Sequence, residues 1–156
     1  MAVTARSLDF TNESWLMTRE AFDMLEADAL RLSQELARTN GYVSGHMSGE
    51  PDAPVFVPNI GGQQLLRQYD SIRDVLSSAL IVDEADIAVI GRRLTLEDDD
   101  GAAEYALVIP GDGDPANGWI SADSPVGRAV LGRRVGERVT IQAPAGARMA
   151  KITRVA

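Results

Sequence analysis

Apolar residues recur at helical spacing in two stretches of the first half of the chain. In each stretch they are separated alternately by three and four residues, with charged residues such as Glu26 and Arg31 between them in the first. Because neither helix could bury its apolar stripe alone, the pattern predicts an antiparallel coiled-coil hairpin over residues 17–80. The apolar positions are Phe22, Leu25, Ala29, Leu32 and Leu36, followed by Leu65, Tyr69, Ile72, Leu76 and Ala79.

Capping and helix-stopping residues mark the ends of these helices. Thr18 is the predicted N-cap, Asn40-Gly41 is a stop signal, and Gly61-Gly62 is a break before the second helix. Residues 1–16 are polar and unpatterned, so we expect a flexible N-terminal arm. Residues 41–61 contain four glycines and three prolines, which forbid a continuous helix and predict a long tip loop.

After about residue 82 the spacing of apolar residues changes from that of a helix to that of strands. Ser124-Pro125 is typical of a helix start, and the short helix that follows is expected to reach Leu131 and stop at Gly132. Residues 81–156 therefore form a predicted antiparallel β-sheet domain with one short helix, which makes the whole chain α+β. The expected strands begin at Ile87 and Val89 and continue at residues 93–97, 105–109, 119–121, 138–142 and 149–155.

Composition narrows the possible functions. A net charge of −8 argues against direct binding of nucleic acid, which requires a basic face to displace counterions, and we expect no sequence-specific nucleic acid binding. The absence of cysteine excludes disulfides, thiolate metal sites and cysteine nucleophiles. No stretch resembles a signal peptide or could span a bilayer, so we expect a cytoplasmic protein with no membrane partner.

Residues able to perform catalysis are sparse. His46 is the only histidine, and no serine stands in a nucleophile elbow. Asp112, Asp114 and Asp123 superficially resemble a calcium loop, but Ala116 occupies the position of the third oxygen ligand. The sequence therefore predicts no catalytic residue, no metal site and no cofactor.

Residues 120–152 resemble the C-terminal signature of the Gre transcript-cleavage factor family. That signature is isoleucine-serine, two variable residues and serine-proline, followed by alanine-leucine, glycine, valine-glycine-aspartate and proline-glycine-glycine. Glu137 replaces the usual aspartate, and Ala145 replaces the first glycine of the last pair. The matching residues are Ile120, Ser121, Ser124, Pro125, Ala129, Leu131, Gly132, Val135, Gly136, Pro144 and Gly146.

The resemblance implies an FKBP-like C-terminal domain that docks on RNA polymerase at the rim of its secondary channel, which the coiled coil enters. In the family, acidic residues at the hairpin tip help to hold magnesium and activate water for transcript cleavage by the polymerase's own active site. That tip motif has no counterpart here, where Glu50 and Asp52 are the only carboxylates of the tip loop. The implied polymerase-binding residues are Ile120, Ser121, Asp123, Ser124 and Pro125.

Three functions remain open at this point. The preferred hypothesis is a polymerase-binding regulator that inhibits transcription at the secondary channel and does not stimulate cleavage. The alternative is a genuine cleavage and anti-arrest factor that uses Glu50 and Asp52. A further alternative is a non-transcriptional binding module, like the related regulator of nucleoside diphosphate kinase. The oligomeric state is open as well, because heptad seams can pair between chains as well as within one.

Overall fold

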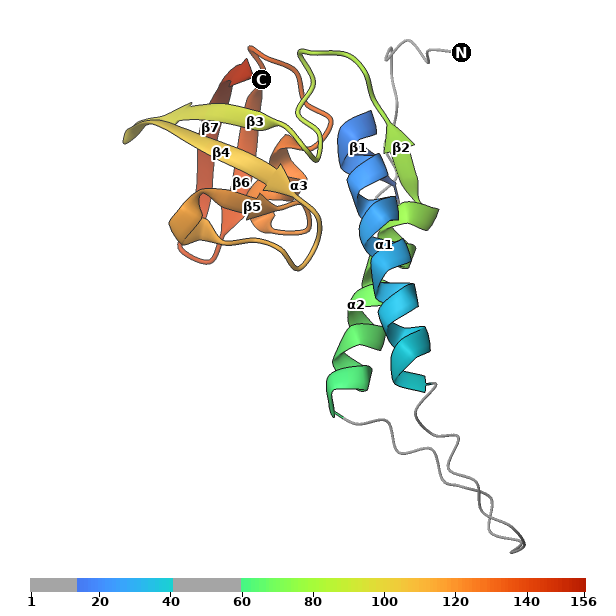
Figure 1. The fold of residues 1–156 in the computed structure, drawn as a ribbon. Coiled ribbons are helices and arrows are strands. Elements are labelled where there is room, and N and C mark those ends of the chain that lie inside the picture. Colours follow the sequence, from blue (N-terminus) through green and yellow to red (C-terminus); the bar gives the residue numbers. More distant parts are fainter. Residues whose placement is uncertain (1–13, 41–59) are drawn as a thin grey trace, which may run out of the picture. The chain divides into compact units, whose positions relative to one another are not determined.

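The computed structural model describes residues 14–40 and 60–156 (Figure 1). These residues fall into two compact units. One unit joins the chain up to Phe22 with Ser78–Ala156, and the other is Asp23–Ser77. The helical unit is therefore inserted, in sequence, between two parts of the sheet-containing unit.

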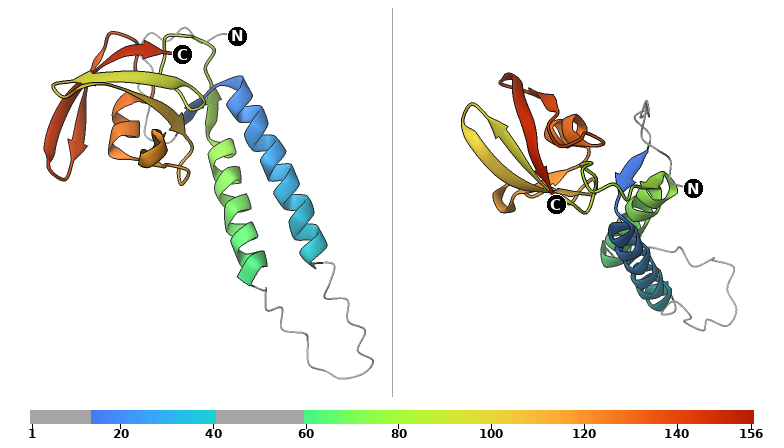
Figure 2. Two further views of the ribbon diagram at one scale, coloured as in Figure 1. Left: turned by 60° about the vertical axis from the view of Figure 1, so that its left-hand side comes forward. Right: turned by 90° about the horizontal axis from the view of Figure 1, so that it is seen from above.

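The two predicted helices are confirmed as α1 (Arg19–Asn40) and α2 (Ile60–Ser77). They run side by side in opposite directions (Figures 1 and 2). Leu25 and Leu32 of the predicted seam are buried, and Val75, which the seam prediction omitted, is only 5% exposed. None of the described helices is long and apolar enough to cross a membrane.

Two helix boundaries differ from the prediction. Gly61 and Gly62 do not precede α2 but lie in its first turn. Ala79 belongs to a strand and not to the end of α2. The remainder of the predicted tip loop, residues 41–59, lies outside the described residues.

A short two-stranded parallel sheet was not predicted. It pairs β1 (Trp15–Met17) with β2 (Ala79–Ile81), in a register that places Trp15 opposite Ala79. The prediction of an unstructured arm up to residue 16 is therefore wrong for its last two residues, and Leu16 is 1% exposed. Three-residue strands are too short to show a period of two. The rest of the expected arm, residues 1–13, lies outside the described residues.

The start of α1 is attached to a buried segment of the sheet-containing unit. The N–H of Ala21 donates to Thr18 Oγ1 over 3.1 Å, which confirms Thr18 as the N-cap. Thr18 also donates its own N–H to the carbonyl of Ile90 over 3.0 Å. The segment 87–90 is fully buried, but it makes only isolated bridges and does not form the predicted strand.

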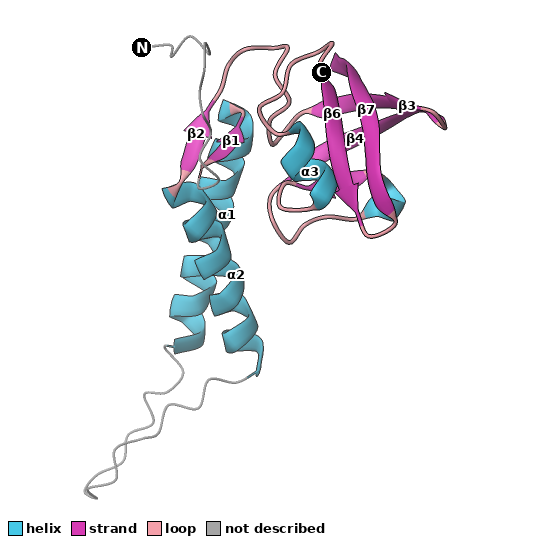
Figure 3. Cartoon of the chain, turned by 180° about the vertical axis from the view of Figure 1, so that it is seen from behind, coloured by secondary structure: helices cyan, strands magenta, loops and turns pink. Residues whose placement is uncertain are grey.

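The larger sheet has five strands in the order β5-β4-β3-β7-β6, with α3 (Pro125–Val130) beside β6 (Figure 3). Its core contains the fully buried Leu94, Leu107 and Ile152. The prediction of an antiparallel sheet is wrong for one pair, because β5 runs parallel to β4. The ten residues between these strands include the 3-10 turn η2 and return the chain to the same end of β4. The strands are β3 (Arg93–Asp98), β4 (Gly101–Val108), β5 (Trp119–Ser121), β6 (Arg138–Ala143) and β7 (Gly146–Val155), and η2 is Pro115–Asn117.

Candidate functional site

The five residues expected to bind a partner lie where β5 leads into α3. Ile120, at the centre of β5, is only 8% exposed and belongs to the core. Ala122 is fully buried as well, and its N–H donates to the carbonyl of Val108 over 2.9 Å. Ile120 therefore supports this segment from beneath, and its side chain is not available to a partner.

Ser124 holds the segment in shape. Its Oγ accepts a hydrogen bond from the N–H of Gly127 over 3.1 Å and donates to the carbonyl of Ser121 over 2.6 Å. The helix start predicted at Ser124-Pro125 is thereby confirmed, with Ser124 as the N-cap and Pro125 at the first helical position. The hydroxyl thus donates one hydrogen bond and accepts another within the segment. Ser124 therefore positions its neighbours and has no hydrogen left to donate to a partner.

Asp123 and Pro125 present their side chains to solvent. The half-buried Ser121 donates its hydroxyl hydrogen bond to the Asp123 carboxylate. This contact orients one carboxylate oxygen and leaves the other lone pairs of the group free to accept hydrogen bonds. Of the five expected residues, Asp123 and Pro125 are thus the ones that can contact a partner most directly.

Two glycines that the sequence analysis did not single out allow this packing. A Cβ atom on Gly127 would collide with the carbonyl oxygen of Ser121. A Cβ on Gly113 would lie 2.9 Å from the Cβ of Ser121, closer than real Cβ contacts come. Ser121 is therefore enclosed by close backbone approaches from α3 and from the loop before η2.

A surface hollow of about 480 Å³ adjoins Asp123 and Pro125. It lies between the start of α3 and the outer strand β6, and it combines a carboxylate, a guanidinium, two apolar side chains and two neutral polar ones. The lining residues are Asp123, Pro125, Arg128, Ala129, Thr140 and Gln142.

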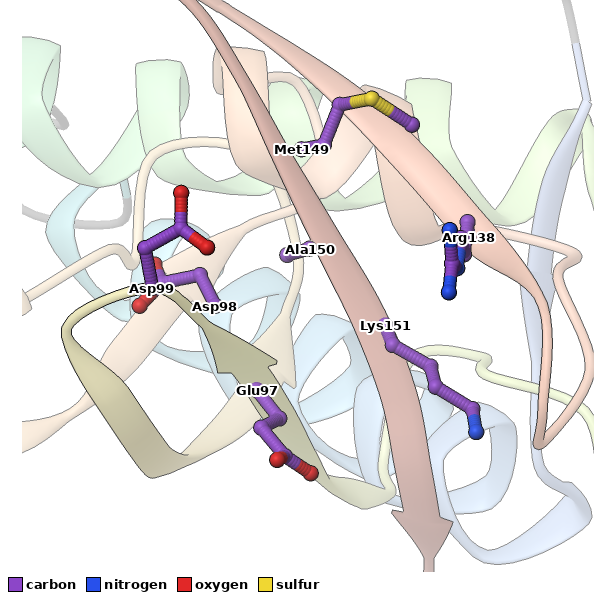
Figure 4. A pocket seen from close by; sticks show the side chains of 7 residues that line it. All are labelled: Glu97, Asp98, Asp99, Arg138, Met149, Ala150 and Lys151. Atoms are coloured by element: carbon purple, nitrogen blue, oxygen red, sulfur yellow. The ribbon is translucent and has the colours of Figure 1, made fainter.

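A second hollow, of about 530 Å³, involves β3, β6 and β7 and contains none of the expected residues. Figure 4 shows the carboxylates of the β3–β4 hairpin on one side and Arg138 and Lys151 on the other. One of these carboxylates, Asp98, already pairs with Arg148 over 3.3 Å. The hollow is lined by Glu97, Asp98, Asp99, Arg138, Met149, Ala150 and Lys151.

Within the described ranges, no group of three or more His, Cys, Asp or Glu side chains is placed to hold a metal ion. Glu50, Asp52 and His46 lie outside those ranges.

Comparison with known sequences identifies the domain that carries this site. Residues 83–156 match the family described as "Transcription elongation factor, GreA/GreB, C-term". The transcription elongation factor GreA of Geobacillus kaustophilus is 38% identical over 90 residues, which cover 54% of this chain and 57% of that protein. GreA of Listeria monocytogenes serotype 4a is 37% identical over 91 residues, with 54% and 57% coverage. The match thus spans little more than half of these relatives.

Two solved structures match most of the chain at low sequence identity. Gfh1, the GreA factor homolog 1 of Thermus thermophilus, is 24% identical with a TM-score of 0.41, covering 92% of this chain and 99% of that one. The GreA/GreB factor from Nitrosomonas europaea is 20% identical with a TM-score of 0.44, covering 91% and 98%. By these sequence matches the chain is similar to Gre factors, and residues 83–156 match their GreA/GreB-type C-terminal domain.

Proposed function

We propose that this protein binds RNA polymerase through residues 121–125 and regulates transcription from the rim of the secondary channel. The observation that carries the proposal is the exposure of Asp123 and Pro125 on a backbone that Ser124 fixes. A preorganised segment of this kind loses little conformational freedom on binding. Its position in a GreA/GreB-type domain supports polymerase as the partner, and the cytoplasm as the site of action.

We further propose that the effect is inhibitory. The acidic tip motif of the cleavage factors is missing from the sequence, and Glu50 and Asp52 flank Pro51 in a segment that a continuous helix cannot cross. A hairpin that occupies the channel without that motif would obstruct the passage of substrate and would supply no ligand for a catalytic metal ion. Inhibition without transcript cleavage follows from these two properties.

A stalled elongation complex of the cognate RNA polymerase tests the proposal. RNA length and elongation rate are followed after the protein is added. Slower elongation with intact RNA is the expected result. If the wild type shortens the RNA and a Glu50→Ala, Asp52→Ala double variant does not, the protein stimulates cleavage and the inhibitory proposal is wrong. Absence of binding would refute the polymerase proposal as a whole.

A pair of variants tests residues 121–125, which we call the docking segment. Asp123→Ala should weaken polymerase binding roughly 10- to 100-fold, the range for losing a hydrogen bond to a charged group. Asp99→Ala removes an equal charge from the β3–β4 turn, at the other end of β4 from the pair Val108–Ser121. Unchanged affinity of Asp99→Ala would show that the site, and not the net charge, is responsible. Equal effects of both substitutions would contradict the docking segment.

A further inference from the structure

Trp119 is the one aromatic residue among the large hydrophobic side chains exposed in the described part of the chain. It is 47% exposed, although it lies in β5 next to the docking segment. Exposed tryptophan is uncommon on a surface that contacts only water, and buried tryptophans dominate the binding energy of many interfaces. The proposed function makes no use of this side chain.

The backbone that carries the indole is held from both sides. On one side, Trp119 pairs with Ala106 of β4. On the other side, its N–H donates to the carbonyl of Asp114 over 2.9 Å, and its carbonyl accepts the N–H of Asp114 over 2.9 Å. Trp119 is therefore a large side chain on a fixed backbone, and ordering it in a complex costs little entropy.

The loop that supplies Asp114 is itself fixed. The Asp114 carboxylate accepts hydrogen bonds from the N–H of Ala116 over 3.2 Å and from Asn117 Nδ2 over 2.6 Å. Gly118 then adopts a left-handed conformation with φ of 72° before β5 begins. The hydrogen bonds of the Asp114 side chain thus fix the loop, and the loop holds the start of β5 in position.

Strand geometry places Trp119 on the same face as the docking segment. Successive side chains of a strand alternate, so Trp119 and Ser121 point away from the buried Ile120. Their partners on β4 are Ala106 and Val108. We refer to Ala106, Val108, Trp119 and Ser121 as the Trp119 patch. Because the neighbour of Trp119 is an alanine, no large β4 side chain lies directly across from the indole.

The charges around the Trp119 patch are mainly negative. The strands and loops around it carry four carboxylates and two guanidinium groups, of which Arg93 is already paired with Glu104 over 3.1 Å and Arg128 lies beside Asp123 in the lining of the 480 Å³ hollow. A surface of this sign attracts a cationic partner. An indole also binds guanidinium or ammonium groups by cation–π attraction. The carboxylates are Glu104, Asp112, Asp114 and Asp123.

We propose that the Trp119 patch is the anchor of the docking surface, with the indole receiving an arginine or lysine side chain of an RNA polymerase segment. The inference rests on the proposed function and extends it in two ways. It adds Trp119 to the docking residues, and it assigns a cationic chemistry to the polymerase segment that Asp123 and the indole contact together.

The first test measures polymerase affinity. Because the chain has no cysteine, a single dye can be attached at an Ala102→Cys substitution, at the far end of β4, for anisotropy titrations. Trp119→Ala should weaken binding about 30-fold or more, as expected for an interface hot spot, while Trp119→Phe should retain part of the affinity. Trp15→Phe is the matched control and should leave the affinity unchanged. Melting temperatures of all the variants establish that they are folded.

The second test examines the indole without polymerase. The Trp15→Phe variant has Trp119 as its only tryptophan, since the chain contains two. Tetra-arginine should change the Trp119 emission saturably and shield the indole from acrylamide, whereas tetra-glutamate should do neither. No response to tetra-arginine would overturn the cationic partner.

The two tests separate the inference from the function on which it rests. Wild-type binding that Trp119→Ala leaves intact would overturn the anchor and leave the proposed function standing. Failure of the wild type to bind polymerase at all would overturn the proposed function and polymerase as the partner of the Trp119 patch. Loss of binding in Trp119→Ala, together with an emission response to tetra-arginine, supports both.

Discussion

Removing the Ser124 hydroxyl should destabilise the sheet-containing unit by about 1.5–2.5 kcal/mol. The N-cap contact to Gly127 typically contributes about 1 kcal/mol. The hydrogen bond to the carbonyl of Ser121 adds a net contribution of about 0.5–1.5 kcal/mol. That carbonyl is not left unsatisfied in Ser124→Ala, because it keeps the N–H of Ser124 at 3.0 Å. The cost of an unsatisfied carbonyl is therefore not added to this loss.

Urea unfolding followed by tryptophan fluorescence measures this loss. The midpoint for Ser124→Ala should fall while the slope of the transition stays constant, because the surface exposed on unfolding is unchanged. Ser124→Thr is the matched control, since it keeps a hydroxyl in the capping position. A change within about 0.5 kcal/mol for Ser124→Ala, the range of ordinary surface substitutions, would refute the reasoning. So would a threonine variant as unstable as the alanine variant.

Two further predictions concern stability. Gly91→Ala should lower the melting temperature clearly more than Gly111→Ala. The two glycines have nearly equal φ, 95° and 94°, but of the two only Gly91 has another group close to the added Cβ, Thr18 Oγ1 at 2.6 Å. Equal losses would show that backbone strain alone matters. The hydrogen bond from Arg134, over 2.7 Å, is the main cause that holds the pKa of Asp86 below its ordinary value of 3.8. The stabilisation is therefore present above the unfolded-state pKa and is lost as the pH falls through the lower folded-state pKa. Asp86→Asn should lower the urea midpoint at pH 7 but progressively less as the pH falls from the unfolded-state pKa through the folded-state pKa, and a deficit independent of pH would contradict this origin.

The sequence predicted those elements that are marked by capping residues or by a local strand pattern. The Thr18 cap, the Ser124-Pro125 helix start and the β5 residues 119–121 all agree with the structure. Each depends on contacts within a few residues of the chain, which a sequence pattern records directly. The hairpin helices were predictable for a related reason, since their apolar period extends over several turns.

Features that depend on distant partners were not predictable in this way. The pairing of β1 with β2 joins residues more than sixty positions apart, and the parallel direction of β5 is decided by the course of the preceding loop. Ile120 is buried, whereas Asp123 and Pro125 of the same candidate site are exposed. This difference could be recognised only once the sheet was known. Exposure of Trp119 could not be inferred either, because a tryptophan in a strand is ordinarily expected to face the core.

The pairing of β1 with β2 means that the helical hairpin leaves and rejoins the rest of the chain at one place. Closing a long loop costs entropy that grows only with the logarithm of its length, so lengthening or shortening the hairpin changes this cost little. A hairpin that forms first also brings Met17 and Ala79 close together, which lowers the entropic cost of pairing β1 with β2. The reach and tip chemistry of the hairpin can therefore diverge between relatives without disturbing the register of the sheet or the surface around Asp123. In descent as in protein engineering, one sheet-containing unit can carry hairpins that differ in length and in tip sequence.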